Sequence, residues 1–230
     1  MKNIINIKET LKGLLIILSY FILPTIIYMP FYFFERKEII NYQVSMILTY
    51  FFTAIVYSYI YRKDLIKDIK NFKENYKLIL STTIKYWFIG LIVMVISSNI
   101  INMIGIAPNT NQEGNIELLR KYPLFEITCA CFIAPIIEEL VYRRSLKNAT
   151  SNKHLFALTS GIIFGLVHVL SSISSSSDLI MLIYLIPFSS VGISFGYAYY
   201  KTNNIYGTII IHSIHNIISI IQIIILGGLI

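Results

Sequence analysis

The sequence predicts an all-α membrane protein, a polytopic bundle of about seven transmembrane helices with an eighth left open. Three observations predict this fold class. Of the 230 residues, 56% are hydrophobic and only 13% are charged, about half the charged fraction of a typical soluble domain. Apolar runs of about 18 residues or more recur along the chain, each long enough to cross a bilayer core of about 30 Å. The charged residues gather in the short segments between these runs, as they do in membrane proteins.

Seven apolar segments are expected to span the membrane: residues 12–33, 44–61, 84–106, 124–146, 155–173, 179–200 and 205–228. The first is too long for a cleavable signal peptide, so we interpret it as a span. The charged segment Arg62–Lys77 is expected to form an interfacial helix or a solvated linker, and the polar segment Pro108–Lys121 a loop. The serine-rich stretch Ser171–Ser177 is expected to form a flexible turn.

Lysine and arginine are unevenly distributed between the two predicted sides of the membrane. With seven spans, 15 of them lie on the side of the N-terminus and 4 on the other side. Because these residues concentrate in cytoplasmic loops, we predict a cytoplasmic N-terminus and an external C-terminus. The same placement argues against a nucleic-acid partner, since no basic groove with interleaved aromatic residues is formed.

Small residues are expected to bring two of the spans close together. Gly161 and Gly165 lie four residues apart in the fifth segment, as do Gly192 and Gly196 in the sixth. Such pairs allow helix backbones to approach closely in lipid. The two cysteines, at positions 129 and 131, lie within an apolar run and are expected to be buried thiols that do not pair with each other.

The fourth segment carries charged residues that a membrane disfavours, in the sequence Pro135-Ile-Ile-Glu-Glu-Leu-Val-Tyr-Arg-Arg144. A charged side chain at mid-bilayer costs on the order of 3 kcal/mol. Glu139 and Arg143 have the spacing of a helical ion pair, whereas Glu138 has no local partner. Pro135 lacks a backbone N–H, so in an α-helix it leaves the carbonyl of Cys131 free and favours a kink beside Glu138. The alternative is that the helix ends early and Glu138 extends to the membrane surface.

Two further segments carry polar residues that could face Glu138. The fifth contains His168, and the seventh contains His212 and Asn216, which lie four residues apart and share a helix face. His215 lies close to that face and is expected to serve packing, and His154 is assigned no role. If the three segments face one cavity, it holds the groups needed to activate a water molecule and stabilise an oxyanion.

These residues together resemble the CAAX-protease and bacteriocin-processing (CPBP) family of intramembrane proteases, which includes the Ras-converting enzyme. The family has three motifs, Glu-Glu-x-x-x-Arg, Phe-x-x-x-His and His-x-x-x-Asn, with one further helix before the last. Here they read Glu138-Glu139-Leu-Val-Tyr-Arg143, Phe164-Gly-Leu-Val-His168 and His212-Ser-Ile-His-Asn216. The resemblance covers about residues 120–220. We therefore expect residues 121–230 to form a four-span catalytic core and residues 1–120 to form three spans without recognised motifs.

The resemblance implies an intramembrane endopeptidase that cleaves a membrane protein or peptide in or near the lipid bilayer, here of a bacterial cell membrane. Glu138 would activate water with His168 taking part, while His212 and Asn216 would polarise the scissile carbonyl and hold its oxyanion. Glu139, Arg143 and Phe164 would support the site.

Dependence on a metal is left open by the sequence. The family has been called a metalloprotease because a glutamate and two histidines, here Glu138, His168 and His212, can ligate zinc. A glutamate-driven mechanism without metal is the other interpretation. No His-Glu-x-x-His motif is present, and we favour the metal-free mechanism.

Other functions account for fewer of these sequence features. Ser194 lies in a Gly-x-Ser-x-Gly pattern, but within a span rather than at a strand-to-helix turn, and Phe195 breaks the rhomboid pattern Gly-x-Ser-Gly. An aspartyl protease is excluded because Asp64, Asp68 and Asp178 are expected in loops. A catalytically silent family member acting as a binding or immunity protein, or a transporter based on glutamate and histidine, stays open.

Overall fold

The computed structural model describes residues 4–107, 109–176 and 179–226, and the elements named below within these ranges are all helices joined by short turns and loops. The elements in order are α1 (Ile7–Arg36), α2 (Tyr42–Ile60), α3 (Arg62–Met103), α4 (Thr110–Lys121), α5 (Pro123–Thr128), the π-helix η1 (Cys129–Ile133), α6 (Ala134–Glu138), the π-helix η2 (Glu139–Arg144), α7 (Lys153–Ser176), the 3₁₀-helix η3 (Leu179–Tyr184), α8 (Leu185–Thr202) and α9 (Ile205–Leu226).

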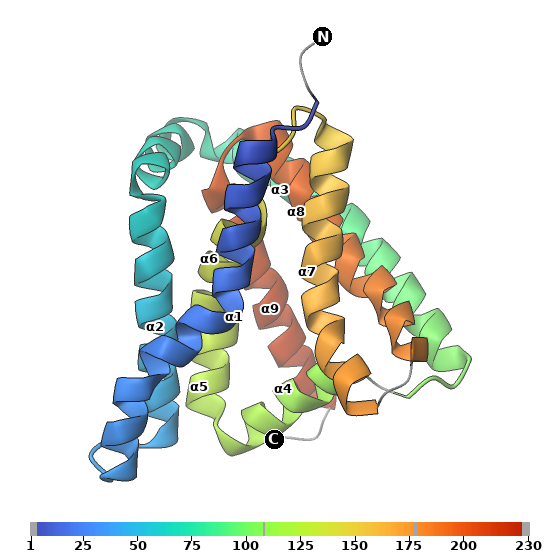
Figure 1. The fold of residues 1–230 in the computed structure, drawn as a ribbon. Coiled ribbons are helices and arrows are strands. Elements are labelled where there is room, and N and C mark those ends of the chain that lie inside the picture. Colours follow the sequence, from blue (N-terminus) through green and yellow to red (C-terminus); the bar gives the residue numbers. More distant parts are fainter. Residues whose placement is uncertain (1–3, 108, 177–178, 227–230) are drawn as a thin grey trace.

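The helices form one bundle in which the fourth predicted span and α9 lie at the centre (Figure 1). α1 packs against α2 on one side of the bundle, and α8 packs against both α7 and α3 on the other side. α9 contacts α3, α8, η1, α6 and η2. α1 begins at one end of the bundle and α9 ends at the opposite end, as an odd number of spans requires.

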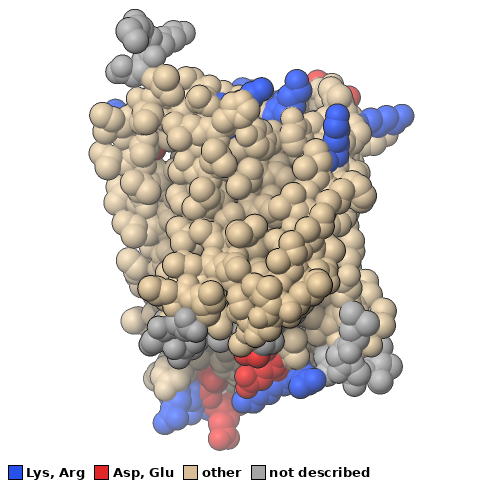
Figure 2. All heavy atoms as spheres, turned by 90° about the vertical axis from the view of Figure 1, so that its right-hand side faces the viewer, with Lys and Arg blue, Asp and Glu red and all other residues tan. Residues whose placement is uncertain are grey.

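The bundle has the surface of a membrane protein. Six helices within the described ranges are long and apolar enough to span a membrane, and they match six of the seven predicted segments. The other predicted segment, 124–146, corresponds to the run from α5 to η2, which is divided into four shorter helices. Figure 2 shows charged side chains at the two ends and a broad band without them between. The predicted polytopic helix bundle is confirmed. We call the end where α7 begins and α8 ends, marked by Lys153 and Lys201, the basic end.

The polar segment expected as a loop, Pro108–Lys121, is for the most part helix α4, so this expectation is wrong. Charges at the ends of the segment explain the helix. Glu113 lies in its first turn and Arg120 and Lys121 in its last, and this order complements the helix dipole. The polarity of the segment favoured a loop, whereas the order of its charges favours a helix.

The expected flexible turn at Ser171–Ser177 is wrong as far as Ser176, because α7 continues to that residue. Ser177 lies outside the described residues. Low sequence complexity therefore did not end the helix.

The charged segment Arg62–Lys77 forms the first part of α3. Of the two structures expected for it, an interfacial helix or a solvated linker, it has the helical one. The backbone leaves helical geometry at Asn75, and the first part of α3 crosses the basic end before the apolar part runs along the bundle (Figure 1). The expectation that Asp64 and Asp68 lie in loops is wrong, because both lie on α3, and Asp178 lies outside the described residues. The buried Asp68 carboxylate accepts the backbone N–H of Ile205 at 3.1 Å, so it holds the first residue of α9 in place.

α7 and α8 approach each other through the predicted glycines. A Cβ added at Gly192 would lie 2.9 Å from the Gly161 carbonyl oxygen, and one added at Gly196 would lie 2.8 Å from the Ala157 Cα. Only residues without a side chain fit these positions. The close packing confirms the expectation from the glycine spacing and sets Phe164 on α7 beside α8.

Candidate active site

Two π-helices shape the fourth span around the glutamates. In η1 the Ala134 N–H bonds the Cys129 carbonyl, and at the end of η2 the Ser145 N–H bonds the Leu140 carbonyl, five residues back in each case. Such widened turns in helices occur frequently at functional sites. The two π-helices lie on either side of the short α6, whose last residue is Glu138. The second of them ends at Arg144.

The π register changes which carbonyl Pro135 leaves without a partner. In an α-helix this would be Cys131, whereas five-residue spacing places the missing bond at Ala130. The Asn216 side chain occupies that position, since its Nδ2 donates to the Ala130 carbonyl at 2.7 Å. The bond ties α9 to the fourth span and orients the predicted oxyanion-binding amide. Nδ2 carries a second N–H that this bond does not use.

Glu138 and Glu139 both lie against His212. The His212 Nδ1 is 3.0 Å from Glu139 Oε1, and its Nε2 is 3.6 Å from Glu138 Oε2. All three residues are buried, with exposed fractions of 8% for Glu138, 0% for Glu139 and 3% for His212. The alternative in which Glu138 extends to the membrane surface is therefore wrong, because this side chain points into the bundle.

The predicted pair of Glu139 and Arg143 is present and fully buried. Arg143 Nη1 lies 3.5 Å from Glu139 Oε1, and Nη2 donates to the Gly192 carbonyl at 3.3 Å. The guanidinium also lies 4.6 Å from the centre of the Phe164 ring, within range of a cation–π contact. A carboxylate only accepts hydrogen bonds, so we assign the proton at Nδ1 to His212, which donates it to Glu139.

Phe164 joins the three motifs in space. Its ring centre lies 4.3 Å from that of His168 and 5.7 Å from that of His212, in addition to its contact with Arg143. The His168 Nδ1 is 2.8 Å from the Phe164 carbonyl oxygen. Because a carbonyl only accepts, Nδ1 carries the proton, and a neutral His168 has its lone pair on Nε2.

Some contacts of the site were missed by sequence reasoning. Phe195 lies 5.3 Å from the His212 ring, and Phe188 stacks on His168 at 5.2 Å. The Gly192 carbonyl, the acceptor for Arg143, was missed too. The rings carried no signal beyond their apolar character. The Gly192 carbonyl could have been suspected, because a glycine at a helix contact exposes its backbone.

The remaining candidate residues make contacts typical of helix packing. The Ser194 hydroxyl donates to the carbonyl of Val191 in its own helix at 2.8 Å. Trp87 Nε1 donates to His215 Nδ1 at 3.3 Å, which fits the packing role expected of His215. His154 lies 2.7 Å from the Tyr197 hydroxyl at the basic end. Cys129 and Cys131 are free and buried, as expected.

A zinc site with Glu138, His168 and His212 as ligands is not assembled in this conformation. Glu138 and His212 are neighbours, but the described part of the chain contains no group of three histidine, cysteine, aspartate or glutamate side chains placed to hold a metal ion. The Nδ1 atoms of His212 and His168 lie against Glu139 and the Phe164 carbonyl, contacts that metal-bound histidines also make, so these bonds alone do not exclude a metal. As placed in the described residues, the three groups do not form a zinc-ligand set, and we propose a reaction carried by the side chains alone.

Comparison with known proteins agrees with the motifs. Residues 120–218 match the family model of the type II CAAX prenyl endopeptidase Rce1-like proteins. The chain is 30% identical over 169 residues to an uncharacterized protein of Mycoplasma capricolum, covering 67% of this chain and 47% of that protein. It is 25% identical over 142 residues to the UPF0177 protein YxdF of Lactococcus lactis, covering 57% of this chain and 73% of the relative.

A third relative, from Bacillus subtilis, carries the name "Putative membrane peptidase YdiL". It is 27% identical over 115 residues, which cover 49% of this chain and 42% of the relative. The chain thus spans about half the length of the Mycoplasma and Bacillus relatives. No solved structure matches it.

Proposed function

Because residues 120–218 belong to the Rce1-like family of type II CAAX prenyl endopeptidases, we propose that this chain is an intramembrane endopeptidase in which Glu138 activates water. The observation that carries the proposal is the buried contact of Glu138 with His212, itself held by Glu139. Burying a carboxylate within a membrane is costly, and intramembrane ionisable residues mostly mark functional sites. The meeting of Glu138 and His212 is explained if both act on one reacting group.

In the proposed reaction Glu138 takes a proton from a water molecule as the water oxygen attacks the scissile carbonyl carbon. The new C–O bond moves the carbonyl electron pair onto oxygen. His212, oriented by Glu139, donates from Nε2 to this oxyanion, and the second N–H of Asn216 also donates to it. The C–N bond then breaks, and Glu138 passes its proton to the leaving amine. His168 assists by accepting a hydrogen bond from the water at Nε2.

The proposed substrate is a peptide or a membrane protein whose scissile bond enters the bundle from the bilayer. Bacterial relatives and the membrane-spanning helices support a location in a bacterial cell membrane. We further propose that the basic end faces the cytoplasm, since most lysine and arginine residues lie on that side.

Trapping with Glu138→Gln tests the proposal. The variant keeps the size and polarity of the side chain but removes the base, so it should bind substrates without cleaving them. Mass spectrometry would identify membrane proteins or peptides that accumulate with the variant and are cleaved in its absence. Purified wild type should cleave those substrates, and Glu138→Gln should be slower by roughly 10²–10⁴-fold. Ser194→Ala should cleave at the wild-type rate. If Glu138→Gln captured partners that wild type binds and leaves intact, the binding or immunity function would replace ours.

A further inference from the structure

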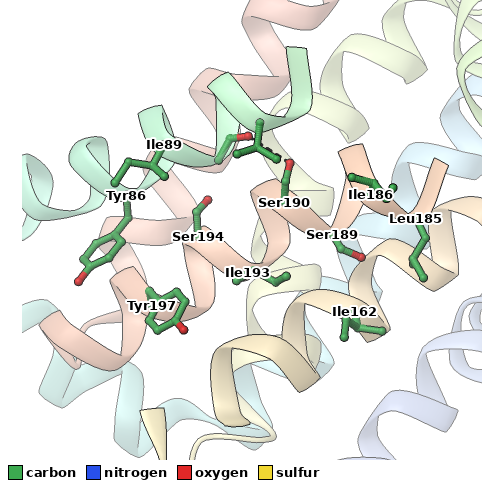
Figure 3. Close-up of a pocket in the computed structure, with 12 residues that line it drawn as sticks. Tyr86, Ile89, Ile162, Leu185, Ile186, Ser189, Ser190, Ile193, Ser194 and Tyr197 are labelled. Carbon is green, nitrogen blue, oxygen red and sulfur yellow. Dashed lines mark hydrogen bonds between the residues drawn. The ribbon is translucent and has the colours of Figure 1, made fainter. Parts of the chain in front are cut away.

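A lateral groove lies on the side of α8 that faces away from the candidate active site. It has a volume of about 540 Å³ and lies between α3, α7 and α8, with lining residues that include Ile89, Ile162, Ile186 and Ile193. This volume is in the range of small-molecule and cofactor sites. Figure 3 shows Tyr86 and Tyr197 at one end of the groove and Leu185 and Ile186 at the other.

The groove is separate from the catalytic machinery. Gly192 and Phe195 of α8 contact the residues around His212, whereas Ser190 and Ser194 line the groove on another face of the same helix. A ligand in the groove would therefore touch α8 without entering the site.

The lining of the groove is apolar except for two tyrosines and three serines, and the serine hydroxyls are buried or already hydrogen-bonded. The Ser189 side chain is 5% exposed, and its Oγ has no hydrogen-bond partner within the described part of the chain. Ser190 and Ser194, in contrast, donate to backbone carbonyls at 2.7 Å and 2.8 Å. The Ser189 hydroxyl is buried against Gly165 in the contact between α7 and α8, so it does not face the groove, and the lining fits an apolar chain.

The charge around the groove is of one sign. Tyr86 and Tyr197 stack with ring centres 5.9 Å apart, and His154 at the first turn of α7 bonds Tyr197, so this end of the groove is its basic end. Three exposed lysines accompany these residues, one on each lining helix: Lys85 beside Tyr86, Lys153 at the start of α7 and Lys201 one turn beyond Tyr197. The apolar part of α3, from residue 79 to 103, and all of α7 and α8 contain no aspartate or glutamate.

We propose that this groove binds an anionic phospholipid. One acyl chain lies between α3 and α8, and the headgroup phosphate lies at the basic end, where the three lysines reach it. Tyrosine rings at that depth occupy the membrane interface, and long lysine side chains extend from it to the headgroups. Charge complementarity selects the occupant: a zwitterionic lipid would fill the apolar groove equally well but would gain less from three lysines.

Native mass spectrometry of the full chain in detergent tests the proposal. The protein is mixed with equal amounts of phosphatidylglycerol and phosphatidylcholine that carry the same acyl chains. Wild type should retain one phosphatidylglycerol with a preference of roughly tenfold or more, since each lysine near an anionic surface adds about fivefold. The triple variant Lys85→Gln, Lys153→Gln, Lys201→Gln should lose this preference. The control Lys63→Gln, Lys67→Gln, Lys70→Gln removes the same charge from exposed positions of α3 and should keep it.

A second pair of variants tests the groove itself. Ile162 is 39% exposed, so Ile162→Trp can fill the groove without disturbing the core and should abolish retention of the bound lipid. Ile55→Trp places the same ring on the exposed face of α2 and should not. Equal retention of both lipids by wild type, equal loss in the two lysine triples, or undiminished binding by Ile162→Trp would each overturn the proposal.

Discussion

The Oε1 atom of Glu139 lies 3.0 Å from His212 Nδ1 and 3.5 Å from Arg143 Nη1. One buried carboxylate oxygen thus contacts both Arg143 of the same helix η2 and His212 of α9. From sequence spacing, Glu139 was expected only to pair with Arg143. The contact with His212 gives it a second role, because a carboxylate on Nδ1 fixes the tautomer and orientation of an imidazole and stabilises its protonated form.

Glu139→Gln should therefore lower both stability and turnover. Removing one partner of a buried ion pair costs roughly 3–5 kcal/mol, and the amide keeps part of the hydrogen bonding, so we expect a loss near 3 kcal/mol. Loss of a carboxylate that orients a catalytic imidazole lowers kcat by roughly 10²-fold or more. Thermal unfolding in detergent measures the first effect, and kcat per folded molecule measures the second.

Glu9→Gln is the matched control, because Glu9 pairs with Lys12 on an exposed face of α1. Such pairs contribute about 0–1 kcal/mol, so neither quantity should change appreciably. If Glu139→Gln destabilised the protein but left kcat per folded molecule intact, Glu139 would serve only Arg143, as its spacing alone suggested.

Asn216→Ala should also lower both the stability of the protein and its kcat. The change leaves the Ala130 carbonyl without its donor beside Pro135, at a cost of about 1–3 kcal/mol. It also removes the proposed oxyanion donor, at a cost of roughly 10²–10³-fold in kcat. Asn99→Ala is the control, since Asn99 Nδ2 bonds the Val95 carbonyl of its own helix at an exposed position. A stable Asn216→Ala variant with normal kcat would contradict both roles.

Gly192→Ala should damage the site from the opposite helix. The added methyl would lie 2.9 Å from the Gly161 carbonyl oxygen and 3.1 Å from Phe164 Cδ1, so α7 and the Phe164 ring must shift. Overpacking of this kind costs about 1–3 kcal/mol, and kcat should fall because Phe164 supports both histidines. Gly114→Ala, with nothing within 4 Å of the new methyl, should be neutral or stabilising by up to about 1 kcal/mol. Equal effects of the two changes on thermal unfolding would contradict the packing argument.

The spans and the polar residues of the candidate site were predictable from the sequence. In lipid, backbone groups must pair within helices, and polar residues within apolar spans are conspicuous. The contact of Glu139 with His212 was not. It depends on the widened turns η1 and η2, and a helix of regular period was the only geometry that spacing could assume. Helix α4 was missed for a different reason, since a polar helix has no apolar periodicity to reveal it.

The orientation in the membrane is predicted by the 15 to 4 distribution of lysine and arginine. A reporter active only outside the cytoplasm should work when fused after Ile230, and one fused before Met1 should not. Replacing the lysines and arginines of the Arg62–Lys85 region by glutamine should weaken this preference, because these residues supply much of the bias. A C-terminal reporter active only in the cytoplasm would mean that the number of spans is even.

Removal of metal should leave proteolysis unchanged. A zinc ion needs ligand atoms about 2.0–2.2 Å away in tetrahedral array, and the described residues contain no group of three histidine, cysteine, aspartate or glutamate side chains placed to hold one. The hydrogen bonds at Nδ1 of His168 and His212 would not block zinc at their Nε2 atoms, so the expectation rests on the placement of the three groups. Dialysis against a strong zinc chelator should therefore preserve kcat, and the zinc content of wild type and His168→Ala should be equally low by elemental analysis. Chelation that abolishes cleavage, with recovery on adding zinc, would show that substrate or metal draws His168 toward Glu138 and His212 into a geometry different from the one described.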